Sequence, residues 1–102
     1  MSESYKIAVK GEGTLHRVKS KLEFHVPVKM KPSSSREWVG KIKSIEVQDD
    51  LDYDVRITAA GRVKFTVEIE NTRTKNVVFK KESFTNVKFP NAAIVHGVCK
   101  AQ

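Results

Sequence analysis

The residues of this chain that could do chemistry are three histidines, one cysteine and a cluster of aspartates. His96 and Cys99 form a His-x-x-Cys pair, which would suit two ligands of a metal ion. A zinc site needs about four ligands and usually paired cysteines, and this chain has a single cysteine. In a strand, positions 96 and 99 also face opposite sides of the sheet. We therefore expect no metal and no cofactor.

The aspartates are Asp49, Asp50, Asp52 and Asp54, and their spacing is similar to that of a calcium-binding loop. Such a loop also needs a sharp glycine turn and a distal bidentate glutamate, and the sequence provides neither at this place. Two interpretations remain open. The aspartates form a solvated strand face, or they form an assembly patch that docks on the basic surface of a neighbouring copy.

Catalysis by a nucleophile requires a Ser, Cys or Thr beside a base that a third group orients. His16, His25 and His96 lie in no such arrangement, and no Gly-x-Ser-x-Gly elbow is present. The Gly11-Glu12-Gly13 turn lacks the Lys-Ser/Thr of a phosphate-binding loop. We therefore expect no catalytic residue and a protein that is not an enzyme.

The formal net charge is +7, which suits binding to a polyanion or to an acidic partner protein. The same charge would also keep a β protein soluble. Trp38 and Phe84 are the candidates for exposed aromatic platforms, because the other aromatic residues share parity with aliphatic neighbours. The cations that could build a polyanion-binding groove are Lys6, Lys10, Arg17, Lys19, Lys21, Lys41, Lys43, Arg62, Lys64, Lys80 and Lys81.

A serine-rich segment is the clearest loop signal. Residues 31–36 place three serines and an arginine after a proline, which predicts a mobile loop. Together with Trp38, this loop is a candidate binding loop made of Ser33, Ser34, Ser35 and Arg36.

The elements that must position these residues are strands. Apolar and polar residues alternate strictly over 51–57 and over 63–69, which predicts two half-buried strands. Ala59-Ala60-Gly61 fits a three-residue hairpin loop between them, in a register that pairs Ile57 with Val63. Residues 22–30 predict one long strand with Phe24 and Val28 inward, and Pro27 places that strand at a sheet edge or a bulge.

Residues 35–46 fit two structures. Trp38, Val39, Ile42 and Ile45 form a helical stripe, whereas the β-branched residues and Gly40 favour a strand with a bulge near residues 43–44. We favour the strand. The chain of 102 residues is then one domain, 1–102, with an all-β fold. We expect an antiparallel β-sandwich or small β-barrel of about seven to nine strands. The alternative is an α+β fold with one helix at 35–46.

The strand-rich C-terminal half, with Val77-Val78-Phe79 followed by residues 84–89, resembles the sheets of phage tail-tube or virion decoration subunits. This resemblance implies a self-assembling structural subunit that forms a homo-oligomer or binds a protein partner. One alternative is a small basic module that binds nucleic acid, and another is an inhibitor or adaptor that docks on an acidic partner. The sequence predicts no signal peptide and no membrane segment, so we expect a location in the cytoplasm or in a virion.

Overall fold

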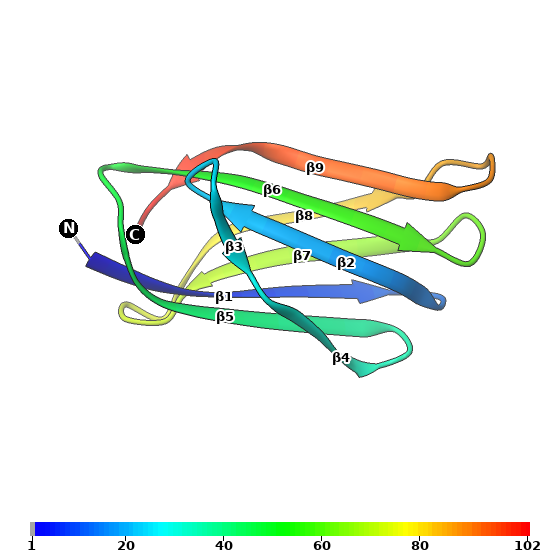
Figure 1. The fold of residues 1–102 in the computed structure, drawn as a ribbon, viewed down its shortest axis with the longest axis horizontal. Helices are drawn as coiled ribbons and strands as arrows, with labels where there is room; N and C mark the ends of the chain where they lie inside the picture. Colours follow the sequence, from blue (N-terminus) through cyan, green and yellow to red (C-terminus); the bar gives the residue numbers. More distant parts are fainter. Residues whose placement is uncertain (1) are drawn as a thin grey trace.

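The computed structural model describes residues 2–102, and these form nine strands in two antiparallel sheets that pack face to face (Figure 1). The larger sheet has the order β4-β5-β1-β7-β8 and the smaller sheet the order β3-β2-β6-β9. The bounds are β1 Ser2–Gly11, β2 Leu15–Leu22, β3 Val26–Val28, β4 Met30–Ser34, β5 Glu37–Glu46, β6 Asp50–Ala59, β7 Lys64–Asn71, β8 Asn76–Phe84 and β9 Asn91–Lys100. The expected all-β sandwich is confirmed, and residues 37–46 form a strand rather than a helix.

The core lies between the two sheets and contains the inward members of the alternating strands. Ile7 and Val9 of β1 and Val55 of β6 belong to this core, and all three are fully buried. The rings of Tyr53 and Phe79 also meet across the layers, with their centroids 4.2 Å apart. Every second residue of β1, β6 and β7 is buried, which is why the sequence alternates so regularly.

The predicted hairpin between residues 51–57 and 63–69 is wrong. The strand β6 pairs with β2 and β9 in the smaller sheet, whereas β7 pairs with β1 and β8 in the larger sheet. The turn at Gly61, which has a φ of +88°, therefore carries the chain from one layer to the other. Two strands that share a core show the same alternation whether they pair side by side or face each other across it.

The predicted strand over residues 22–30 is also wrong, because the chain reverses at residues 23–25. Glu23 and Phe24 have positive φ angles, and Phe24 is 77% exposed instead of lying in the core. The reversal pairs β3 with β2, so that Leu22 and Val28 are both buried in the same sheet. Pro27 does lie on an edge strand, as predicted.

Directly after β3, the chain crosses from the smaller sheet to the larger one and continues as β4. This crossing runs over Gly40 of β5 at very short range. A Cβ atom on Gly40 would lie 2.5 Å from the Met30 sulfur and 2.8 Å from the Lys29 carbonyl oxygen. The glycine is therefore required by the close approach of Val28, Lys29 and Met30, which covers this side of the sandwich.

The strand β5 contains the predicted bulge. Its pairing with β1 shifts between Tyr5, which is opposite Ile42, and Glu3, which is opposite Ile45. Ser44 lies in the shifted stretch with a φ of +58°. Residues three positions apart would point to opposite faces of a regular strand. The bulge allows Ile42 to pack against the core and Ile45 to be buried in it.

A buried polar cluster lies where the two chain ends meet. The Glu3 carboxylate is buried and accepts two-pronged hydrogen bonds from the Arg73 guanidinium, with 2.8 Å between Nη2 and Oε2. The Tyr5 hydroxyl and the Asn71 amide both donate to the Ala101 carbonyl, each at 2.8 Å. The hydrogen bonds from Arg73 lower the pKa of Glu3, although burial opposes this effect. None of the described segments is a helix with the length and hydrophobicity to span a bilayer.

We predict that Gly40→Ala destabilises the protein, because the new methyl group forces the Val28–Met30 crossing away from β5. The expected loss is about 1–3 kcal/mol in the free energy of unfolding, as for overpacked cores. Urea denaturation measures it, with Lys41→Ala, an exposed neighbour on the same strand, as the control. Equal midpoints for Gly40→Ala and the wild type would show that the crossing is not tightly packed.

We also predict an acid-dependent loss of stability through Glu3. Its pKa is lower in the folded chain than in the unfolded chain, so its contribution is complete above the ordinary value of 4.5 and disappears as the pH falls through the folded value. Glu3→Gln should flatten this part of the stability profile between acidic and neutral pH. Exposed Glu12→Gln is the matched control, and an identical profile for both variants would contradict the prediction.

Candidate interaction surfaces

The predicted polyanion-binding cations do not form one surface, because most of them are divided between the two outer faces of the sandwich. Arg62 lies in the turn between β6 and β7, and Lys81 lies on the edge strand β8. On the larger sheet, the lysines alternate with glutamates on neighbouring strands. Lys10 lies 3.7 Å from Glu37, and Lys64 lies 3.6 Å from Glu82. A shallow pocket over Ala8 is likewise lined by three lysines and three glutamates. The charges on this face therefore largely compensate one another.

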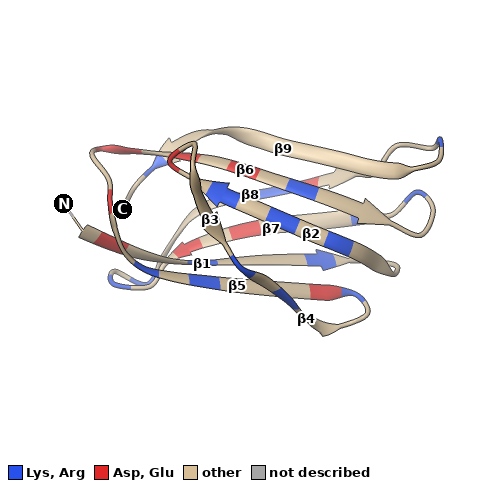
Figure 2. Cartoon of the chain, viewed as in Figure 1, with Lys and Arg blue, Asp and Glu red and all other residues tan. Residues whose placement is uncertain are grey.

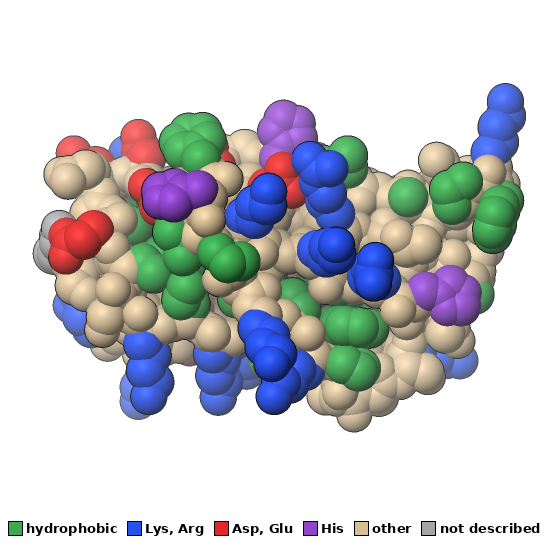
Figure 3. Space-filling view, viewed as in Figure 1, with side chains coloured by type: hydrophobic (Ala, Val, Ile, Leu, Met, Phe, Trp, Pro, Cys, Tyr) green, Lys and Arg blue, Asp and Glu red, His purple; other side chains and the backbone are tan. Residues whose placement is uncertain are grey.

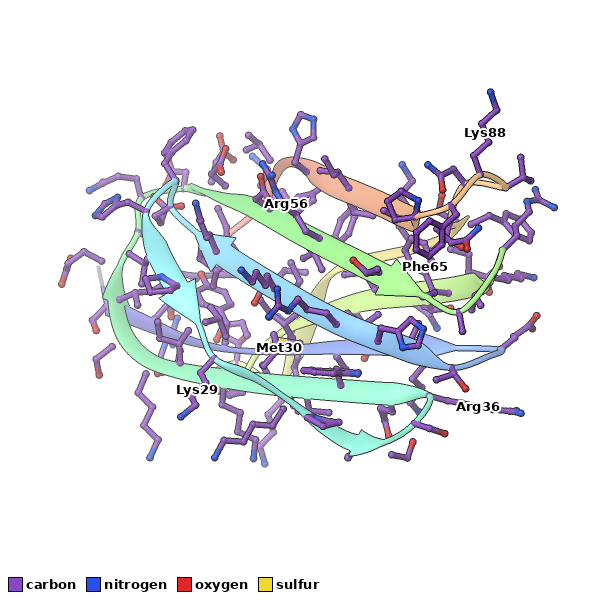
Figure 4. All side chains as sticks on the ribbon, turned by 45° about the vertical axis from the view of Figure 1, so that its right-hand side comes forward. Lys29, Met30, Arg36, Arg56, Phe65 and Lys88 are labelled. Atoms are coloured by element: carbon purple, nitrogen blue, oxygen red, sulfur yellow. The ribbon has the colours of Figure 1, made fainter. Side chains whose placement is uncertain are left out.

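The smaller sheet carries a more concentrated set of cations. Arg17, Lys19 and Lys21 of β2 are exposed and lie in a row beside β6 (Figures 2 and 3). Lys29 adds a cation from the β3–β4 crossing, and Arg56 adds one from β6 (Figure 4). Among the described residues, these five side chains come closest to the basic groove that the sequence predicts.

A groove lies between this row and the crossing, and we call it the Trp38 groove. It has a volume of about 360 Å³ and a largely apolar surface. Its lining residues are Arg17, Val18, Lys19, Ser20, Lys21, Pro27, Val28, Lys29, Met30 and Trp38. The groove exists because β3 pairs only with residues 20–22 of β2 and then leaves the sheet. On that side, β2 therefore has no neighbour strand beyond Ser20 among residues 2–102, whereas β6 pairs with its other side.

Trp38 reaches this groove from the larger sheet. It is paired with Val9, whose side chain is in the core, so the indole points between the layers. The indole Nε1 is buried and has no hydrogen-bond partner. A buried N–H donor without an acceptor is uncommon and costs free energy.

The serine-rich segment is a β-hairpin rather than a mobile loop. Ser33 and Ser34 belong to β4, and only Ser35 and Arg36 form the turn. The Ser33 hydroxyl donates to Glu37, and the Arg36 N–H donates to the Ser34 hydroxyl. Loop-forming composition predicted flexibility, but Pro32 is tolerated here because β4 is a sheet edge. The role of this segment in binding stays a prediction.

Asp49 directly precedes β6, and the other three aspartates lie in the first half of that strand, where acidic residues gather in Figure 2. Asp50 lies 3.6 Å from the Lys100 ammonium, and Asp54 lies 3.2 Å from the Arg56 guanidinium. Asp49 and Asp52 lie beside them at the same end. Their role as an assembly patch stays a prediction, but two of the four charges already have partners within the chain.

The strand β9 presents an exposed apolar edge that the sequence analysis missed. Ile94 is 57% exposed and Val98 is 60% exposed, and both point outward from the smaller sheet beside His96. The adjoining loop adds Val87 and Phe89, the latter 93% exposed. The sequence does indicate an uncharged strand here, because residues 89–99 contain no Lys, Arg, Asp or Glu.

The backbone of β9 also faces outward at these positions. The N–H and C=O of Ala92 are engaged by Asn86 of the preceding loop rather than by β6. Successive strand residues direct these groups to opposite sides. The N–H and C=O groups of Ile94, His96, Val98 and Lys100 therefore lie on the open side of β9. We call these four residues the β9 edge.

The predicted chemical residues are scattered. His96 and Cys99 lie on opposite faces of β9, since His96 is beside Asp54 and Cys99 is beside the buried Leu51. His16 is on β2 and His25 is in the following turn. Within residues 2–102, no group of three or more His, Cys, Asp or Glu side chains could hold a metal ion.

Comparison with known proteins adds no function. No protein-family model, no curated protein and no solved structure matches this chain.

The Cys99 thiol faces the half-buried side of β9. Burial, and then the nearby Asp50 carboxylate, raise its pKa to about 11. Because the thiolate is the reactive form, we predict that iodoacetamide alkylates Cys99 at pH 8 more than about tenfold more slowly than it alkylates glutathione. Mass spectrometry over time measures this. A rate equal to that of glutathione would show that the thiol is accessible and ionised.

Proposed function

We propose that this protein is a non-enzymatic subunit that associates with a second copy of itself along the β9 edge. One observation carries the proposal: among the described strands, β9 combines an outward backbone edge with exposed apolar side chains and lacks edge protection. Such edges pair readily with another strand. The pattern resemblance of the C-terminal half to virion subunits points to the same class of protein.

The other three sheet edges contrast with β9. The edge strands β3 and β4 are three and five residues long, and each contains a proline. The strand β8 carries Lys80 and Lys81, and its pairing with β7 shifts near Val77. Short strands, prolines, lysines and bulges are the features by which β proteins prevent edge pairing. The ten residues of β9 contain one lysine, Lys100, and its charge lies next to Asp50.

Symmetry and the backbone alternation together fix the register of such a dimer. A two-fold axis at His96 places Ile94 of one copy opposite Val98 of the other, and the reverse. All these residues direct N–H and C=O groups toward the partner, so each pair can exchange two hydrogen bonds. A shift by two residues would place Ile94 opposite His96 or Lys100, which loses the apolar contact.

We predict that Ile94→Lys and Val98→Lys each shift the protein from dimer toward monomer. A lysine at the pairing edge has to be desolvated against the apolar residue opposite it, and the two-fold axis introduces two such lysines into one interface. Analytical ultracentrifugation over a range of concentrations measures the shift. Phe24→Lys is the matched control, because it adds the same charge at an exposed apolar residue in the β2–β3 turn.

The register has a separate test. Ile94→Glu alone and Val98→Lys alone should both weaken the dimer, and the double variant should restore it, because the introduced carboxylate and ammonium lie opposite each other. If each single variant weakens the dimer and the double variant does not restore it, dimerisation through the β9 edge would be supported but this register would be rejected. A wild-type protein that stays monomeric at all concentrations, at low and high salt, would reject the proposed function.

A further inference from the structure

The Trp38 groove carries an inference that is independent of self-association, because it lies at the opposite side of the smaller sheet from β9. We propose that this groove binds an extended acidic segment of a partner protein, in which carboxylates alternate with apolar side chains. The shape, the charge and the hydrogen-bonding groups of the groove each support this partner.

The shape of the groove suits one extended chain. It runs between β2 and the β3–β4 crossing. The turn between β4 and β5 closes one end, where the Leu15 N–H donates to the Ser35 carbonyl at 2.8 Å. The Glu23 N–H bonds to β6, so the backbone groups of Lys19 and Lys21 face β6 and those of Ser20 face β3; the register shift at residues 15–17 reverses this order at Leu15. The ladder to β3 ends at Ser20, so the backbone of Val18 faces the groove. An added strand could therefore align with β2 at this position.

The chemistry on the two sides of such a strand differs. One set of its side chains would point between the layers, where Val28, Met30 and Trp38 offer an apolar floor. The alternate set would point to the outer face, beside the cations of Arg17, Lys19 and Lys21. An extended segment directs successive side chains to opposite faces. The surface therefore matches alternating apolar and acidic residues, and charge complementarity sets the sign of the partner.

The indole of Trp38 supplies a specific donor. Its Nε1 is buried without a partner, so a turn of the indole toward the groove would let a carbonyl or carboxylate oxygen of the bound segment accept its hydrogen bond. A single nucleic-acid strand fits less well, because that mode uses several aromatic faces on which bases stack. The groove contains one aromatic residue among its lining.

The test uses a fluorescently labelled synthetic peptide of about eight residues that alternates Glu and Val, the length of a typical strand. Fluorescence polarisation measures its binding to the full chain. Trp38 is the single tryptophan, so its indole N–H gives one resonance in a ¹H–¹⁵N spectrum, and we expect that resonance to shift on binding. A matched peptide with Gln in place of Glu should bind more weakly.

Variants identify the site. The Lys19→Glu/Lys21→Glu double variant should weaken binding by about tenfold or more, which corresponds to 1.4 kcal/mol. The Lys41→Glu/Lys43→Glu variant makes the same charge change on β5 of the larger sheet and should bind as the wild type does. Trp38→Phe keeps a ring but removes the donor, and a loss of about twofold to tenfold is expected for one hydrogen bond. Thermal unfolding confirms that each variant is folded.

Three outcomes would overturn the inference. The first is no binding of the acidic peptide at concentrations up to about 1 mM, where even weak sites are occupied. The second is equal weakening by the β2 and β5 charge variants without a shift of the indole resonance, which indicates attraction by net charge alone. The third is tighter binding of an oligothymidylate than of the peptide, which would make the groove a nucleic-acid site. Because Ile94→Lys leaves the groove unchanged, repeating the titration with that variant separates this result from self-association.

Discussion

The close packing of the β3–β4 crossing on Gly40 is the constraint on which the rest of this structure depends. The absence of a side chain at Gly40 lets Lys29 and Met30 pass directly over β5, so the chain can leave one sheet and join the other. Both sheets are thereby closed along this side by short strands that contain prolines. Because the chain leaves the side of β2 at this crossing, it also opens the Trp38 groove. The crossing therefore both closes this side of the sandwich and creates the groove.

The two sides of the sandwich consequently differ in character. The crossing side has few free backbone groups, and its recognition features are cations and an apolar floor. The far side has the β9 edge, whose backbone groups are open and whose outward side chains are largely apolar. A partner at the first side is selected by charge, whereas a partner at the second side is selected by strand pairing and shape. The two surfaces lie on opposite edges of the smaller sheet, so both can be occupied at once.

The sequence predicts the fold class and the bulge near Ser44, because both follow from local alternation and its interruption. It does not predict that β6 and β7 face each other across the core, since the apolar residues of both strands are inward in either arrangement. The sequence also does not predict the chain reversal at Glu23 and Phe24, because neither residue type usually adopts positive φ. The sequence predicts the candidate surfaces as charges and a serine-rich loop, and it predicts Trp38 as an exposed aromatic residue, whereas its indole points between the layers. Their separation onto two faces, and the role of Trp38, depend on which strands are neighbours, which a single sequence does not encode locally.

The polar cluster at Ala101 has a topological consequence. The Tyr5 hydroxyl and the Asn71 amide hold the Ala101 carbonyl against β1 and β7, so the start of β1 and the segment after β9 lie at the same end of the sandwich (Figure 1). A short glycine linker could therefore join them, and new termini could be made in the exposed turn at Gly61. Such a circular permutant would keep every strand pair while making β7 the first strand and β6 the last. The natural chain and the permutant would then have the same contacts and would differ only in the order in which their strands are synthesised.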